Sequence, residues 1–235
     1  MVQAIAGLKR AVDLTESQAT GESWSLASLK GRLTELVGDT DSANISVAAR
    51  LVVSAQRAGA LAAWVATHRD VFFPPDLAAA GVDLAALPVV WAIEKETEAQ
   101  ISTLRDTPGK SRRTAHIPKL RDTPADRAAR SAERLIRTGA VGIVIIDLAR
   151  TLVLSPAAQG RLLRLAEQHR TQVLILRRAR EDDNYSGSLV SVRAQSSRER
   201  VSAGRFRCTI TSTKDKREGP GWTMSEEFSG PPGLY

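Results

Sequence analysis

The chain has a single cysteine, few aromatic residues and no long apolar run. Cys208 is the one cysteine among 235 residues, which excludes an intrachain disulfide and is typical of a reducing compartment. It alternates with Phe206 and Ile210, a pattern that favours a buried small hydrophobic residue over a nucleophile. No stretch approaches twenty apolar residues, and the N-terminus lacks the features of a signal peptide. We therefore expect a cytoplasmic protein without a membrane contact.

Histidines and aromatic residues are also scarce. His68, His116 and His169 are far apart and have no cysteine nearby, so we expect neither a metal site nor a cofactor. Only 4% of the residues are aromatic, which gives little support to a stacking platform for single-stranded nucleic acid.

Positive charge is abundant and unevenly distributed. The formal net charge is +7 and the isoelectric point about 10.1. Residues 105–137 carry ten basic side chains against four acidic ones, and residues 177–217 carry eleven against five. Either a solvated surface or an anionic partner explains these segments.

Apolar periodicity predicts strands that alternate with helices. The expected strands cover 32–38, 61–67, 87–93, 141–148 and 172–178, and the expected helices cover 42–59, 74–81, 125–138 and 155–170. Ser42 and Ser155 are candidate N-caps. This alternation indicates an α/β fold with a doubly wound, mostly parallel sheet and helices on both faces.

The two ends of the chain and one internal segment have a different composition. After residue 187 the apolar period changes to two, which predicts an antiparallel hairpin from 188–195 and 205–216. "LRDTP" occurs twice within the basic segment 95–123, which we interpret as an inserted loop or an arm for DNA or a partner. We divide the chain into an N-terminal helix and linker (1–29), a core (30–220) and a flexible tail (221–235).

The stretch "GDTDSANI" follows the first expected strand, where a phosphate-binding loop would lie. Such a loop reads glycine, four residues, glycine, lysine, then serine or threonine. Ala43, Asn44 and Ile45 replace the last three of these. The stretch is either a nucleotide site that has lost its chemistry or an ordinary turn.

Several stretches, in this order, resemble the RecA recombinase family. They are the loop above, "AQRAGALAAWV", "AAAGVDLAAL", "RTGAVGIVIIDL" and "STKDKREGPGW". The likeness covers about residues 30–220 apart from the insertion, and within the group the chain is most similar to the ImuA family. The resemblance implies a RecA-like core, and it implies that the loop descends from a nucleotide-binding site.

The resemblance also implies that the nucleotide chemistry is lost. Asn44 has no charge for the phosphates, Ile45 has no oxygen for Mg²⁺, and Ala43 crowds the backbone. Losing two charge-assisted interactions, each worth about 1.5–3 kcal/mol, would weaken binding by several orders of magnitude. The complete degenerate loop consists of Gly38, Asp39, Thr40, Asp41, Ser42, Ala43, Asn44 and Ile45.

Other positions of the family's machinery are altered as well. Arg69 stands at the position of the catalytic glutamate, unless a shift of one residue places Asp70 there. The strand-end acid is retained as Asp147, but Leu148 follows it instead of a hydroxyl residue, so we expect a vestigial, structural role.

Basic residues supply the candidate contacts to DNA or a partner. Arg177 and Arg178 occupy the family's γ-phosphate-sensing position, and Lys214 and Lys216 match a lysine pair that reaches a neighbouring subunit's nucleotide. The candidate contacts are Arg112, Arg113, Arg177, Arg178, Lys214 and Lys216. Ile5, Leu8 and Val12 form an apolar stripe at helical spacing, which suits either a partner's groove or the protein's own core.

Three functions remain open from the sequence. Resemblance to the ImuA family implies a catalytically silent accessory protein in damage-induced, mutagenic translesion synthesis. Its implied partners are an ImuB-type inactive Y-family polymerase, RecA and an error-prone replicative-type DNA polymerase, in a nucleoid-associated location. The alternatives are a sequence-independent DNA-binding module, which the basic segments favour, and a divergent RecA-like ATPase.

Overall fold

The computed structural model describes residues 24–39, 42–69, 72–93, 123–149, 152–178 and 187–229. Within these ranges the chain forms an α/β fold around one eight-stranded mixed sheet. Its strands are β1 (Leu33–Gly38), β2 (Leu61–Ala66), β3 (Val89–Trp91), β4 (Val141–Asp147), β5 (Gln172–Arg178), β6 (Val192–Ser202), β7 (Arg205–Asp215) and β8 (Thr223–Ser229). Its helices are α1 (Asn44–Arg57), α2 (Pro74–Ala79), the 3₁₀ turn η1 (Leu84–Ala86), α4 (Pro124–Arg137) and α5 (Pro156–His169).

The sheet is parallel over most of its width. The strand order is β3-β2-β4-β5-β1-β6-β7-β8. The strands from β3 to β6 in this order run parallel, and β7 is antiparallel to both of its neighbours, β6 and β8. The predicted α/β class, mostly parallel sheet and C-terminal antiparallel hairpin are therefore confirmed.

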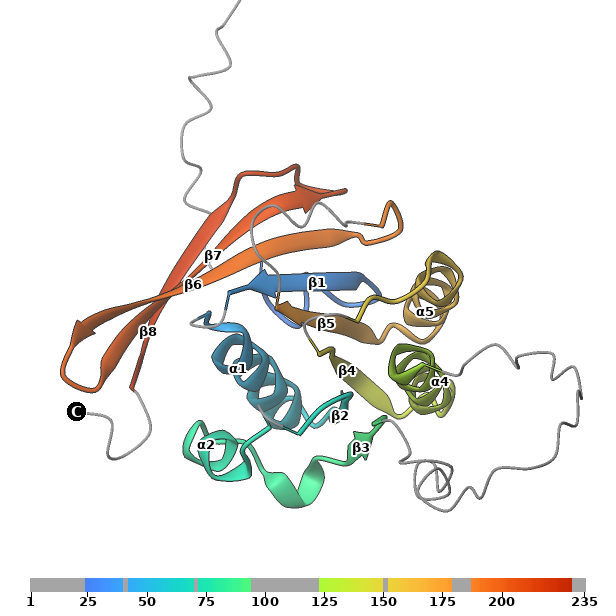
Figure 1. Cartoon of the computed structure of the whole chain (residues 1–235), viewed down its shortest axis with the longest axis horizontal. Coiled ribbons are helices and arrows are strands. Elements are labelled where there is room, and N and C mark those ends of the chain that lie inside the picture. The colour runs from blue at the N-terminus through green and yellow to red at the C-terminus, as the bar shows by residue number, and fades with distance from the viewer. Residues whose placement is uncertain are drawn as a thin grey trace, which may run out of the picture.

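The central strands are apolar throughout because helices cover both of their faces. Ile143 and Ile145 of β4 pack in the layer beneath α1, whereas Val144 and Ile146 pack beneath α4 and α5. Figure 1 shows α1 and α2 on one side of the sheet and α4 and α5 on the other.

Of the two predicted N-caps, Ser155 is confirmed and Ser42 is not, and a third cap, at Thr123, was not predicted. Ser155 caps α5 through the Ala158 N–H, and Thr123 forms a capping box with Asp126 at the start of α4. Ser42, predicted to cap α1, does not: the N-cap is Ala43, and no side chain bonds the free N–H groups there.

Parts of both segments that flank the predicted core belong to the folded structure. Residues 223–229, assigned to a flexible tail, form β8, which pairs with β7 from Thr223 to Ser229. Residues 24–29, assigned to the linker, contribute Trp24 and Leu29 to the core beneath α1. The ring of Trp24 lies 6.1 Å from that of Trp222, so the two segments close one end of the molecule together.

The β6–β7 hairpin is longer than predicted and extends beyond the parallel strands. β6 pairs with β1 as far as Gln195 and continues to Ser202. At about 3.3 Å per residue the remainder reaches ~23 Å past β1. Figure 1 shows this long ribbon at the edge of the sheet.

Candidate functional site: a filled phosphate-loop position

The carboxyl ends of the parallel strands bring most of the predicted site residues to one edge of the sheet. Ligands of doubly wound folds bind at this edge. The loop 38–43 leaves β1 and enters α1, His68 and Arg69 follow β2, and Asp147 ends β4. Thr40, Asp41 and Asp70 lie outside the described residues.

Ser42 fills the space above Gly38. A Cβ at residue 38 would lie 2.2 Å from Ser42 Cβ and 2.4 Å from Ser42 Oγ, so only glycine fits. The Ser42 N–H donates to the Asp39 carbonyl at 3.0 Å and closes a tight turn. The loop therefore folds over its own first glycine, and a side chain occupies that space.

Asn44, which the RecA resemblance aligns with the phosphate-contacting lysine, is directed into the sheet. It is 4% exposed. Its Nδ2 donates to the Arg177 carbonyl at 2.9 Å and, at 3.5 Å, to the Leu36 carbonyl, while its Oδ1 accepts from Ser196 Oγ at 2.7 Å. One amide thus ties the start of α1 to β1, β5 and β6.

The two residues beside Asn44 are apolar and packed. Ala43 is 1% exposed, and Ile45 packs against the core beneath α1. Neither presents a polar group toward the loop.

Asp147 contacts a histidine that the sequence did not suggest as its partner. Asp147 is buried, and its Oδ1 lies 3.2 Å from His68 Nε2. Thr67 Oγ1 donates to the Asp147 carbonyl and accepts from the Ala149 N–H. These contacts join the ends of β2 and β4. The other carboxylate oxygen, Oδ2, has no hydrogen-bond partner among the described residues.

Arg69, which the RecA resemblance aligns with the catalytic glutamate unless the register shifts by one residue, lies against an exposed aromatic group. Its guanidinium is 5.6 Å from the centre of the Trp91 ring. Phe72 stacks edge-on against Trp91 and Trp64. Arg69 therefore contributes a cation–π contact at the β3 edge.

Arg177, predicted to contact DNA, is buried in an ion-pair cluster. It is 5% exposed, and its Nη1 donates to Glu35 Oε1 at 3.2 Å. Arg193 Nε lies 3.1 Å from Glu35 Oε2. Arg177 is thus buried in this structure, whereas Arg178 is partly exposed; whether either residue contacts DNA or a partner stays a prediction.

The sequence did not single out Glu35, although a signal was present. A lone glutamate in an apolar strand needs a buried cation. Arg193 is its direct neighbour in the parallel β1–β6 register.

Lys214 and Lys216 hold a turn of their own chain. Lys214 Nζ donates to the carbonyls of Gly187 and Ser188 at 3.4 and 3.2 Å, and Lys216 Nζ donates to Leu189 at 3.5 Å. Burial lowers the pKa of Lys214, and the charges of Lys216 and Arg193 lower it further. Arg112 and Arg113, the other predicted contacts, lie outside the described residues, as do Ile5, Leu8 and Val12.

A second buried cluster joins the start of β1 to the end of β7. Asp215 pairs with Arg32 and accepts from Trp222 Nε1 at 3.3 Å. Burial alone would raise the pKa of Asp215, but hydrogen bonds from Arg32 and from the N–H groups of Arg217 and Glu218 outweigh it and hold the pKa below its ordinary value. This cluster was not predicted.

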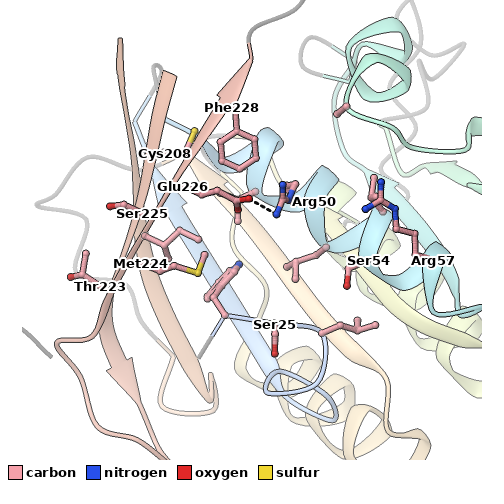
Figure 2. Close-up of a pocket in the computed structure, with 17 residues that line it drawn as sticks. Ser25, Arg50, Ser54, Arg57, Cys208, Thr223, Met224, Ser225, Glu226 and Phe228 are labelled. Carbon is pink, nitrogen blue, oxygen red and sulfur yellow. Dashed lines mark ion pairs between the residues drawn. The ribbon is translucent and has the colours of Figure 1, made fainter. Parts of the chain in front are cut away.

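A groove of about 960 Å³ runs between α1 and β8, away from the carboxyl edge. Figure 2 shows Arg50 of α1 reaching across to Glu226 of β8, with Phe228 beside the pair. The Arg50 guanidinium lies 5.4 Å from the centre of the Phe228 ring. Cys208 lies in the groove wall and is buried, as predicted, and burial raises the pKa of its thiol.

No family model matches the chain, and no curated protein matches it. None of the described helices is long and apolar enough to cross a membrane. Among the described residues there is no group of three metal-ligating side chains.

Proposed function

We propose that this chain is a catalytically silent, RecA-like accessory protein that works through protein contacts. The filled phosphate-loop position carries the proposal. Ser42 covers Gly38, and the side-chain amide of Asn44 hydrogen-bonds to three strands. A nucleotide would have to displace both side chains, and Asn44 has no positive charge to offer in return.

The proposed role is in damage-induced, mutagenic translesion synthesis, as the ImuA-like sequence features suggest. The proposed partners are an ImuB-type inactive Y-family polymerase, RecA and an error-prone replicative-type DNA polymerase. A cytoplasmic, nucleoid-associated location follows from that role. The α/β sheet with its antiparallel C-terminal strands is compatible with a RecA-like core.

The test is complex formation with and without nucleotide. The purified chain should bind an ImuB-type polymerase or RecA with the same affinity in buffer, in Mg²⁺-ADP and in Mg²⁺-ATP. Asp147→Ala should bind equally well, because its carboxylate is engaged with His68. The proposal fails if neither partner binds, or if a complex forms only when ATP is present.

The projecting hairpin favours DNA binding as a second candidate function. The part of β6–β7 beyond β1 carries four exposed arginines, namely Arg198, Arg200, Arg205 and Arg207. Glu227 pairs with Arg205 and Arg207, which leaves the tip with a net positive charge.

Salt dependence tests this second candidate. Each phosphate contact contributes about 0.9 to the slope of log affinity against log salt. The double variant Arg198→Ala/Arg200→Ala should lower the slope by up to about two units with little change in sequence preference. The control pair Arg134→Ala/Arg164→Ala, exposed on α4 and α5, should leave it unchanged. Equal slopes in both variants would exclude the hairpin as the DNA contact.

A further inference from the structure

The C-terminal hairpin has one apolar face and one polar face. Cys208, Ile210, Met224 and Phe228 belong to the core cluster on the α1 side or pack against it. The opposite face carries hydroxyl pairs such as Thr209–Ser225. An antiparallel sheet of this pattern has one face in solvent and needs a cover on the other.

The described residues cover that apolar face only in part. α1 lies along one side of the groove, and residues 24–26 close one end, where Trp24 contacts Trp222. In Figure 2 the groove continues from Ser25 toward Phe228 between the helix and the strands. The surface between them is therefore a slot lined by a helix on one side and strands on the other.

The chain itself supplies a segment of the right length at the right place. Residues 1–23 precede Trp24, which lines the groove. Ile5, Leu8 and Val12 recur at helical spacing, and a helix over residues 3–14 would be ~18 Å long. The part of α1 that lines the groove, Val47–Arg57, spans ~15 Å by the same rise. The segment between Val12 and Trp24 is long enough to turn back.

Charge indicates the direction in which the segment would lie. Arg50 is neutralised by Glu226. Arg57 lines the groove on the last turn of α1, is exposed, and has no ion pair with any described residue. Asp13 follows the apolar stripe in the sequence and is closer to Trp24 along the chain than the stripe is.

We propose that residues 3–14 dock in this groove within the same molecule. The apolar stripe of Ile5, Leu8 and Val12 then faces Met224 and Phe228, and Asp13 faces Arg57. A partner that binds the stripe would have to displace it from the groove. This docking does not depend on whether the protein binds a nucleotide, because the groove lies away from the carboxyl edge of the sheet.

Cysteine labelling tests the docking directly. Ser54 is exposed and lines the groove, so Cys208→Ser/Ser54→Cys places one reporter thiol in its wall. Deleting residues 1–20 should speed maleimide labelling of that thiol about tenfold. Leu8→Asp in the full-length chain should do the same. Gln3→Asp, with the same charge change on the opposite face of the helix, should not. A synthetic peptide of residues 1–20, added to the truncated chain, should restore protection.

Three results would overturn the proposal. Labelling could be equally fast in the full-length and truncated chains, in which case nothing from residues 1–20 covers the groove. Protection could depend on protein concentration, which would make a second copy the occupant. Protection could appear only with an added partner protein. Circular dichroism of each variant confirms that the comparison is between folded proteins, and Ser197→Cys, on the outer face of β6, serves as a thiol whose labelling stays constant.

Discussion

The Asn44 amide, at the position where the RecA resemblance expects a phosphate-binding lysine, hydrogen-bonds to the protein itself. A lysine needs an open, anion-facing position, whereas this amide is buried against carbonyls and a hydroxyl. Sequence alone showed that the charge was missing. It could not show that the replacement had acquired a structural task, because the partners Arg177 and Ser196 are distant in the chain.

Asn44→Ala should destabilise the fold by about 1–3 kcal/mol, because it leaves the Ser196 hydroxyl and the Arg177 carbonyl buried without their partner. Urea unfolding monitored by circular dichroism measures the change. Ser54→Ala, on an exposed turn of the same helix, should change stability by less than about 0.5 kcal/mol. Equal effects of the two substitutions would show that the buried amide does not hold the loop.

Glu35 is a second residue whose importance depends on burial. Glu35→Gln keeps the shape of the side chain but removes the carboxylate that pairs with Arg177 and Arg193. The expected loss is about 3–5 kcal/mol. Glu227→Gln breaks half-exposed pairs with Arg205 and Arg207 and should cost about 0–1 kcal/mol. If thermal and urea unfolding give similar losses for both variants, the buried cluster is not a main support of β1.

At the scale of elements, the sequence predicted most of the fold. The runs around Ile145 and Leu174 are apolar throughout because both faces of the sheet are covered, so strand positions were easy to recognise. The prediction failed for β8, whose sequence "TMSEEFS" carries two glutamates and follows a Gly/Pro-rich turn. Its pairing with β7 is a long-range interaction that local propensity does not report.

Asp215 links the end of β7 to Arg32, just before β1, and makes the stability of this link depend on pH. Its pKa in the folded protein lies below the ordinary value of 3.8. The ionised carboxylate therefore stabilises the fold above that value, and the contribution is lost as pH falls toward the folded pKa.

Asp215→Asn should lower stability at neutral pH and flatten the dependence of unfolding free energy on pH between about 5 and 2. Asp76→Asn, an exposed residue of α2, provides the control and should retain the parental slope. If Asp215→Asn keeps the full pH dependence of the unfolding free energy, other carboxylates are responsible for that dependence.

At the scale of the whole molecule, the candidate site was predicted in outline only. The order of elements located the loop, Asp147 and Arg69 at the carboxyl edge. The His68 contact, the Ser42 cover and the burial of Arg177 depend on how separate strands meet, which spacing does not reveal. At this edge of the sheet the side chains of Asn44, Asp147 and Arg177 bond to the protein itself and stabilise the sheet.

The central claim is that this position does not bind a nucleotide. Isothermal titration of the full-length chain with Mg²⁺-ATP measures it most directly, alongside phosphate release with and without single-stranded DNA. We predict no saturable heat at ligand concentrations up to about 1 mM; a dissociation constant of that size corresponds to a binding free energy of roughly −4 kcal/mol. We also predict phosphate release equal to the buffer control. Saturable binding in the micromolar range that is lost in Asp147→Ala, or turnover that this substitution abolishes, would contradict the account.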